Sequence, residues 1–585
     1  MNRFPLILIF AILLSACSED EPKQFKYAGG KITMALDNQP STYQPQKVMD
    51  FYSATVLCQI TEGLVGMDSR TTKIVPRIAK KWKKSSNGQT YTFYLREGIK
   101  FHPHKGFKSE EERFLTAEDV VKSFEIGCTE DEKGEPLATY SMVCKSLVKG
   151  ADEFHVGEAK NISGIVASGN KVTFHLIHSD HNFLYKLANV SSHIISKKLY
   201  DRGYKTDVVG TGPFVYNKFS TNKEDDQSAL LLTKNTEYYI KDSKGNALPY
   251  LDSLEFVFQS RKLEQLDMFE NRKIDVILGL PTSQITKMVQ GRLEDFNSKP
   301  PKLILENNAL LETNYYIFNM EDERFKDPKV RMAFNYAIDK KVIGIDILRN
   351  QMNDVGVYGI TPPVLKALKG YDFEGIKEVG YNYDPEKARK LLAEAGFPNG
   401  EGFGSIQLRY NINDIHSAVA DEFSKQIRSV LNINVNIDGS TFEKLIEDAE
   451  TGNGDIFRLG WNADYPSPES FLVNFYGKNV PDDLSTPSKV NKSRYRNPVF
   501  DEFYEQATDT KKQIDQLEYF AKAEKVLLKD PPLIPLWYTG DYAIIYSNIR
   551  NFYFNALNYF DFTYVYKKDW TKEEFLKKHI GNKEK

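Results

Sequence analysis

The sequence predicts an α/β protein, chiefly because strand-like and helix-like segments alternate in its second half. Strand-like runs at 406–412, 433–437 and 455–461 are separated by helix-like runs at 417–431 and 441–449. This βαβαβ order is typical of a parallel sheet with right-handed crossovers. The 585 residues are 27% charged and 41% hydrophobic with a formal net charge of -3, which indicates a soluble globular protein with two or three cores and no nucleic-acid footprint.

The chain begins with a pattern typical of an export signal. Arg3 is followed by an apolar run over residues 4–14 and by Ser15-Ala16-Cys17, and this run is too short to cross a membrane as a stable helix. The L-S-A-C motif resembles a bacterial lipobox, which implies a lipoprotein signal peptide at 1–16, acylation of Cys17 and a tether at 17–29. The alternative is an ordinary cleaved signal with an incidental cysteine. No other segment reaches about 18 uninterrupted apolar residues.

The first part of the body mixes short strands and helices less regularly. Turn signals such as Asn87-Gly88 separate these segments. The predicted elements are a strand at 30–36, a polar loop at 37–46, a helix at 53–64, a strand at 90–95, a helix opened by a capping box at Thr116–Asp119, and a strand at 171–176.

The second half contains a well-delimited helix before the βαβαβ segment. Asp384 is typical of an N-cap, Pro385 fits the first helical position, and Gly396 ends the helix. In open α/β sheets, ligands bind beyond the carboxyl ends of the strands. Residues 460–465 lie at that end of the strand 455–461, so we expect them to face a ligand.

Two opposite charges lie in this strand and just after it. Arg458 is a permanent cation and Asp464 a carboxylate, and Tyr465-Pro466-Ser467-Pro468 then breaks the extended chain. A ligand that carries both an ammonium and a carboxylate would find a partner for each. Without further context, an Asp after a strand is more often a turn or cap residue, and an Arg in a strand an internal ion-pair partner.

Several motifs, in order and over nearly the whole chain, resemble one family. The chain is similar to the extracytoplasmic solute-binding proteins, family 5, of ABC importers that take up peptides and nickel. The motifs are E-G-L-V-G-M-D (62–68), I-V-P-R-I-A-K-K-W (74–82), T-Y-T-F-Y-L-R-E-G-I-K-F (90–101), T-A-E-D-V-V-K-S-F (116–124), V-G-T-G-P-F (209–214), L-P-Y-L-D-S-L-E-F (248–256), V-R-M-A-F-N-Y-A-I-D (330–339) and Y-D-P-E-K-A-R-K-L-L-A-E-A-G-F (383–397).

The resemblance implies a fold and its division into lobes. The fold is the two-lobed periplasmic binding protein type II (large, cluster C), with mixed sheets, a hinge and an extra subdomain in the first lobe. Lobe I is expected at 30–50, 200–311 and 531–585, the extra subdomain at 51–199 and lobe II at 312–530. Two crossings between the lobes would act as a hinge that closes on the ligand.

The resemblance also implies the ligand site. In related oligopeptide-binding proteins the segment matching Gly-Trp-x-Ala-Asp-Tyr pairs with a bound peptide as with an extra strand. Asp464 would pair with the peptide's α-ammonium, Arg458 would meet the carboxylate of a short peptide, and Trp461 would form a pocket wall rather than plain core. Gly460 and Asn462 would supply main-chain hydrogen bonds.

Asp37 and Asn38 are further candidates on the loop of the opposite lobe. The L-D-P pattern expected there is replaced by S-T-Y-Q-P, which leaves their register open. Cys128 and Cys144 bracket a loop-like stretch and form either a disulfide, in an oxidising compartment, or two buried thiols.

The sequence gives no support for metal binding, hydrolysis or nucleotide binding. The histidines invite a metal interpretation, but alternation along a strand sends neighbouring side chains to opposite faces, and we expect no metal or other cofactor. No H-E-x-x-H, G-x-S-x-G or G-x-x-x-x-G-K-[ST] motif occurs. The histidines concerned are His175, His178 and His181, and His102 and His104.

The sequence therefore predicts a transport component rather than an enzyme. We expect a monomeric, lipid-anchored receptor in the cell envelope that captures oligopeptides and delivers them to a membrane permease with its ATPase. The alternatives are the same scaffold with another solute, such as a nickel chelator or a murein or signalling peptide, and more remotely an enzyme or adhesin. The sequence does not define peptide length, side-chain preference or affinity.

Overall fold

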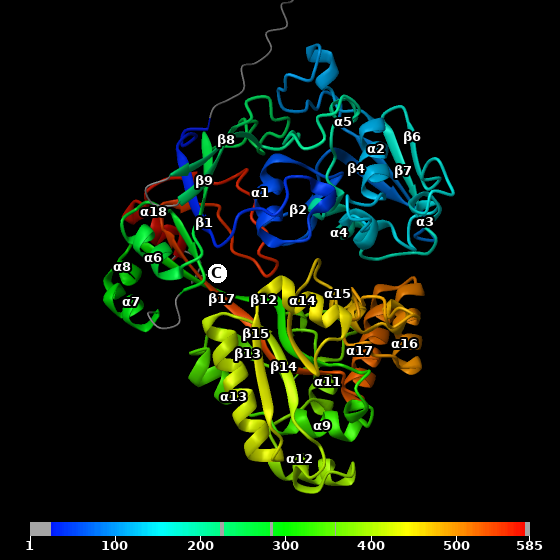
Figure 1. The fold of residues 1–585 in the computed structure, drawn as a ribbon. Coiled ribbons are helices and arrows are strands. Elements are labelled where there is room, and N and C mark those ends of the chain that lie inside the picture. Colours follow the sequence, from blue (N-terminus) through cyan, green and yellow to red (C-terminus); the bar gives the residue numbers. More distant parts are fainter. Residues whose placement is uncertain (1–24, 223–226, 281–284, 357, 580–585) are drawn as a thin grey trace, which may run out of the picture.

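Two long strands, β12 (Leu303–Phe318) and β17 (Leu533–Tyr546), run through both lobes of the protein (Figure 1). The computed structural model describes residues 25–222, 227–280, 285–356 and 358–579. Cys17 and the predicted signal peptide lie outside them. In Figure 1, lobe I and its extra subdomain form the upper part and lobe II the lower part.

One sheet joins the two lobes. Pairing is parallel for β14 with β15 and with β16, as the βαβαβ pattern predicted. The strand order is β15 (Val435–Ser440), β14 (Ile406–Asn411), β16 (Ile456–Asn462), β12, β17, β11 (Val276–Leu278), β1 (Lys31–Leu36), β10 (Ser253–Phe258), β9 (Gln227–Lys234) and β8 (Phe214–Asn222), with β13 (Met352–Val355) on β17.

The crossings between the lobes lie inside β12 and β17. Residues 303–309 pair with 540–546 in lobe I, and 313–317 pair with 533–538 in lobe II, with a register shift between them. The first crossing lies between Ala309 and Thr313. The second lies at Thr539 and Gly540, not at the predicted 530/531, because the first half of β17 is a strand of lobe II.

The extra subdomain has its own sheet and core. Its antiparallel strands are β4 (Ala79–Lys84), β5 (Thr90–Leu95), β7 (Lys171–His175) and β6 (Ile165–Ser168), and α2 (Ala117–Gly127) packs against them. The predicted capping box of Thr116 and Asp119 is present. However, α1 (Phe51–Ile60) buries Val56, Leu57 and Ile60 in the core of lobe I, so the subdomain begins after α1 and not at residue 51.

Lobe II carries helices on both faces of its sheet, which gives it two cores. This arrangement buries residues 456–459 of β16 and 533–538 of β17 on both sides of the sheet. One face holds α9 (Pro328–Tyr336), α12 (Pro385–Glu394) and α13 (Asp414–Leu431), and the other α11 (Phe373–Val379), α14 (Phe442–Thr451), α16 (Pro498–Asp509) and α17 (Gln513–Lys529). The predicted α/β, two-lobed fold class is confirmed.

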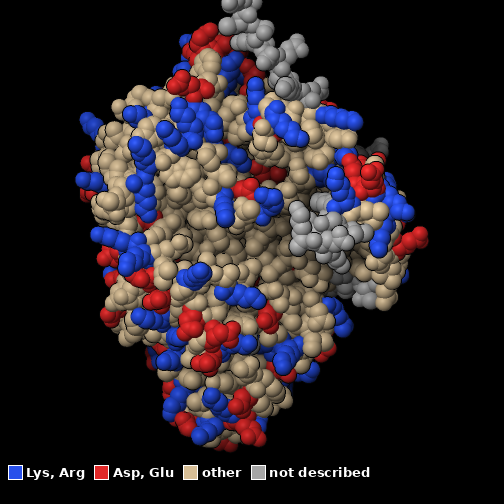
Figure 2. Space-filling model, turned by 180° about the vertical axis from the view of Figure 1, so that it is seen from behind, with Lys and Arg blue, Asp and Glu red and all other residues tan. Residues whose placement is uncertain are grey.

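The remaining elements are short. They are β2 (Val65–Met67), β3 (Ile74–Pro76), β18 (Ile549–Arg550), β19 (Tyr566–Lys567), α3 (Ala151–His155), α4 (Phe183–Ala188), α5 (Lys197–Asp201), α6 (Lys262–Glu270), α7 (Ile285–Gly291), α8 (Leu293–Asn297), α10 (Lys340–Val342), α15 (Glu469–Leu472) and α18 (Lys572–His579). None of the described helices is long and apolar enough to span a bilayer. Acidic and basic residues are interspersed on the face seen in Figure 2.

Candidate functional site

A cavity of about 690 Å³ lies between the lobes. This volume is in the range of small-molecule and peptide sites. Aromatic and apolar side chains dominate its wall. The upper wall includes Met49, Phe51, Tyr52, Cys58, Met142, Tyr559 and Phe560, and the lower wall Phe442, Trp461, Asn462, Asp464, Phe475 and Lys492.

The end of β16 forms one side of this cavity. Residues 459–464 line it, as the position of this segment beyond the strand's carboxyl end predicted. Strand β14 pairs with Ile456 and Phe457 but with no later residue of β16. Among the described residues, the edge of β16 beyond Phe457 therefore offers main-chain groups on its β14 side for an added strand.

Asp464 presents an unpaired carboxylate to the cavity. Its main-chain N–H donates to Ser470 Oγ at 3.0 Å, which fixes the turn after β16. Among the described residues, its carboxylate makes no hydrogen bond and no ion pair. Burial raises its pKa to about 6, and attraction to Lys186 lowers the pKa by less. A carboxylate in this setting gains most from a ligand cation that arrives with hydrogen bonds to donate.

Arg458 lies deeper in the same strand and is absent from the cavity lining. Its side chain is buried, and the guanidinium donates to the amide oxygens of Asn314 and Asn411. No carboxylate of the described residues lies within ion-pairing distance, and Nε has no acceptor there. Burial lowers the pKa of Arg458, and attraction to Glu312 opposes this shift. The structure therefore does not bring Arg458 and Asp464 together in one cavity wall.

The other predicted residues of β16 lie at the cavity. Trp461 forms part of the wall and donates from Nε1 to Ser470 Oγ at 3.4 Å. Asn462 is exposed toward the cavity. At Gly460 a side chain would lie 3.1 Å from Asn314 Oδ1 and 3.3 Å from Arg458 Nη2. Glycine at this position thus gives the Arg458 guanidinium its space.

Asp37 and Asn38 do not line the cavity. Asp37 accepts from Lys262 Nζ at 2.6 Å and from Gln265 Nε2 at 2.8 Å, so its charge is already compensated within lobe I. Asn38 lies beside the Tyr52 hydroxyl. The upper wall is formed instead by residues 48–52, which the sequence analysis did not select. The sequence feature that could have indicated this wall is Met49, an apolar residue in a predicted loop. In the structure the Met49 side chain is 75% exposed.

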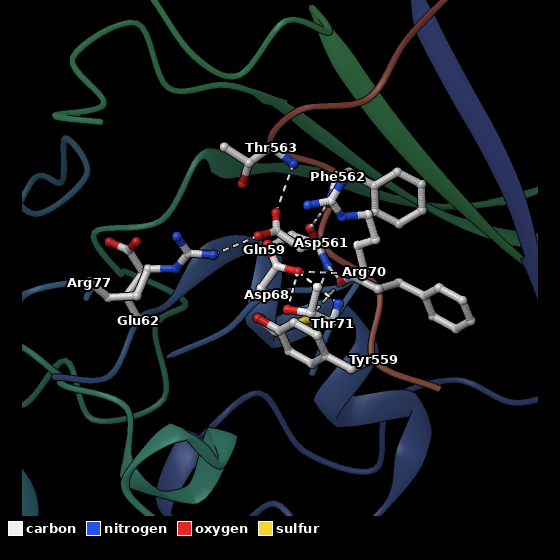
Figure 3. Close-up of polar contacts among 12 residues, drawn as sticks. Gln59, Glu62, Asp68, Arg70, Thr71, Arg77, Tyr559, Asp561, Phe562 and Thr563 are labelled. Atoms are coloured by element: carbon white, nitrogen blue, oxygen red, sulfur yellow. Dashed lines mark hydrogen bonds and ion pairs between the residues drawn. The ribbon is translucent and has the colours of Figure 1, made fainter. Parts of the chain in front are cut away.

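A buried polar network fixes the upper wall to α1 (Figure 3). Gln59 donates to the Phe560 carbonyl at 2.6 Å and accepts from the Phe562 N–H at 3.2 Å. Arg77 pairs with Asp561 at 2.7 Å, and both side chains are nearly buried. Because Tyr559 and Phe560 line the cavity, these contacts hold the C-terminal segment in place as its wall.

The histidines of the two clusters have separate partners. His102 is buried against the Gly212 carbonyl and its pKa is lowered by burial to about 4, while His104 contacts Asp207. His175 contacts Thr90, and His181 donates to the Thr510 carbonyl of lobe II. No group of three or more His, Cys, Asp or Glu residues suited to a metal ion occurs in the described ranges.

Cys128 and Cys144 are buried free thiols in the structure. They lie next to each other in the core of the extra subdomain, and a hydrogen bond to Cys128 raises the pKa of Cys144. The predicted disulfide is therefore not formed here, although the two thiols are neighbours. Cys58 lies apart from them and lines the ligand cavity.

A sheet shared by two lobes with a cavity between them defines the class of two-lobed solute-binding proteins. The family model of bacterial extracellular solute-binding proteins, family 5 Middle, matches residues 73–482, and the chain belongs to this family.

Relatives of known binding behaviour cover nearly the whole chain. Di/tripeptide-binding protein 1 of Pseudomonas aeruginosa is 25% identical over 93% of this chain and 92% of that protein. Heme-binding protein A of Haemophilus influenzae is 26% identical over 86% and 85%. Among solved structures, the Helicobacter pylori periplasmic binding protein DppA in complex with a peptide superposes with a TM-score of 0.73, at 23% identity, over 93% of this chain and 99% of that chain.

Proposed function

We propose that this protein is the substrate-binding component of an ABC importer and that it captures peptides in the interlobe cavity. The observation that carries the proposal is the unpaired carboxylate of Asp464 beside an open strand edge. The α-ammonium of a peptide supplies a cation with three N–H donors. Its main chain supplies the groups that the edge of β16 lacks, independently of sequence.

The remaining contacts follow from the same pose. Aromatic and apolar walls accept side chains of varied shape, with Trp461 as one surface. For the carboxylate of a short peptide we propose Arg458, because its Nη2 lies only 3.3 Å from where a side chain at Gly460 would begin, and Gly460 lines the cavity. Longer peptides would place their carboxylate elsewhere, so we assign Asp464 the larger share of recognition.

We further propose that the mature protein is a monomeric lipoprotein of the cell envelope. The L-S-A-C motif supports acylation at Cys17. The partners would be the membrane permease and its ATPase, which receive the peptide when the lobes open. A catalytic role has no support from the motifs or from the relatives, which are binding proteins by name.

Identification of the natural ligand tests this proposal. Mature protein purified from its own cells without denaturant is analysed by native and denaturing mass spectrometry and by absorption spectroscopy. We expect a mixture of short peptides with free amino termini. Porphyrin absorbance, a bound metal chelate or a bile acid, in the absence of peptides, would reject peptide binding and favour another solute on the same scaffold.

A direct titration complements the ligand search. Wild-type protein freed of bound ligand is titrated calorimetrically with tripeptides and with their N-acetylated forms. We expect the free tripeptides to bind more tightly, because acetylation removes the charge that Asp464 attracts. Equal affinities would reject the ammonium contact but leave peptide binding itself intact.

A further inference from the structure

The extra subdomain meets lobe II beside the cavity through one buried polar cluster. Helix α4 faces α15 across the lobe boundary (Figure 1). Asn182 donates to Glu469 at 2.6 Å and to Ser467 Oγ at 3.2 Å. Lys186 Nζ lies 2.7 Å from Asp180 and 3.6 Å from Glu469. The side chains of Lys186, Asp180 and Glu469 are 15%, 6% and 10% exposed, so closure removes these charges from water.

This cluster shares its turn with the predicted ammonium anchor. Asp464 lies in the turn before α15 and Glu469 is the first residue of that helix, and Ser470 of α15 ties the two together by accepting from the Asp464 N–H. Lys186 is the cation that acts on Asp464. Three carboxylates, those of Asp180, Glu469 and Asp464, therefore depend on the ammonium of Lys186.

Two further side chains complete the surroundings of this charge group. His178 acts on Asp180 as a cation when it is protonated. The Tyr465 ring lies 6.0 Å from Lys186 Nζ and presents its face to the ammonium. Neither His178 nor Tyr465 supplies a second permanent cation. When the lobes are closed, the three carboxylates and the one ammonium of Lys186 therefore carry excess negative charge at neutral pH.

Resting on the proposed peptide function, we propose that Lys186 is a specificity-determining residue. With Asp180, Asn182, Ser467 and Glu469 it forms an interlobe latch that closes fully only when the ligand brings a positive charge to Asp464. In the open state, water solvates the carboxylates. In the closed state they are desolvated, and the ligand ammonium supplies the missing cation. Such differential contact with the two states lets a ligand select the closed one.

The test compares free and N-acetylated tripeptides in three single variants. Lys186→Gln removes the latch cation and should weaken the free tripeptide about tenfold or more, mainly through faster dissociation. Because the negative excess grows, the affinity ratio of free over acetylated peptide should rise by about threefold or more. Glu469→Gln reduces the negative excess, so the ratio should fall below that of wild type. Lys186→Arg should retain wild-type behaviour.

A matched control uses another ion pair between the lobes. Lys489 of lobe II pairs with Glu135 of the extra subdomain, but both side chains are half exposed, and solvent screens such a pair. Lys489→Gln should leave both affinities and their ratio within about twofold of wild type. A general loosening of the structure would weaken both peptides equally, so ratios unchanged in Lys186→Gln and Glu469→Gln would overturn the inference.

Failure of the proposed peptide-binding function can be distinguished experimentally from failure of the latch. If wild-type protein bound no peptide, the function would be rejected, and small-angle X-ray scattering would still decide the latch. Glu469→Gln, which lowers the negative excess, should then reduce the radius of gyration of the ligand-free protein relative to wild type and to Lys489→Gln, because closure no longer needs a ligand cation. Equal radii in all three proteins would reject the latch as well.

Discussion

Substitution of Asp464 by Asn should change ligand affinity and stability in opposite directions. The pKa of Asp464 is raised from 3.8 to about 6 because its carboxylate is buried without a partner. A shift of about two units corresponds to about 3 kcal/mol of unfavourable free energy for the charged form. At pH 7 the ligand-free protein therefore loses up to that amount of unfolding free energy through this charge, and Asn removes the loss.

The sign of this effect depends on pH. A carboxyl whose pKa is raised on folding is destabilising above its folded pKa and neutral below its unfolded pKa. The stability gain of Asp464→Asn should thus be full at pH 7, shrink as the pH falls below 6 and vanish near 4. Denaturant titrations of ligand-free protein at these pH values measure it.

Affinity should move the other way. Removing one partner of a buried charge pair costs about 2–5 kcal/mol, so free tripeptides should bind about 30-fold to several-thousand-fold more weakly to Asp464→Asn. N-acetylated tripeptides should bind the variant at least as tightly as wild type, because the variant has no unpaired carboxylate to desolvate on closure. Substitution of the fully exposed Asp482 by Asn is the control and should change neither quantity. A variant at 464 that binds free tripeptides as wild type does would refute the reasoning.

Three further predictions concern charge and thiol chemistry. Wild-type affinity for free tripeptides should fall about tenfold between pH 7 and pH 5 as Asp464 takes up a proton, and a flat calorimetric profile would contradict this. Breaking the buried pair by Arg77→Met should cost about 3–5 kcal/mol in denaturant unfolding, because it leaves Asp561 charged and unpaired; a loss below about 1 kcal/mol would show that the pair behaves as an exposed one. Cys128 and Cys144 are free thiols in the structure, so both should be alkylated after denaturation without prior reduction, whereas resistance to alkylation until reduction would show a bridge formed in an oxidising compartment.

Local signals in the sequence account for much of lobe II. Asp384 caps α12 and the alternation at 406–461 forms β14, α13, β15, α14 and β16, because caps and periodicity act over a few residues. The position of the second boundary between the lobes could not be predicted in this way. The pairing of 533–538 is decided by partners in β12 that lie far away in the sequence, and no local pattern reports which lobe a strand joins.

The site likewise contains residues whose positions the local sequence predicts and residues whose positions depend on distant parts of the chain. The position of Asp464 at the cavity was predictable because it follows a strand and because the Gly-Trp-x-Ala-Asp-Tyr resemblance points to the same residue, while its role stays a prediction. The position of Arg458 behind the cavity wall could not be predicted, because the amide groups that hold it, those of Asn314 and Asn411, come from other strands. The upper wall at Met49 was missed because a loop residue becomes a wall only when the opposite lobe faces it.

The shared strands constrain how the chain reaches its native state. Strand β11 of lobe I pairs with residues 543–545 of β17, which are synthesised more than two hundred and fifty residues later. Until β17 has been synthesised, strand β11 of lobe I and strand β12 each keep an unpaired edge. Unpaired strand edges of this kind attract other chains. Strand β17 thus closes the sheet, and truncation before β17 should leave an aggregation-prone chain rather than a smaller binding protein.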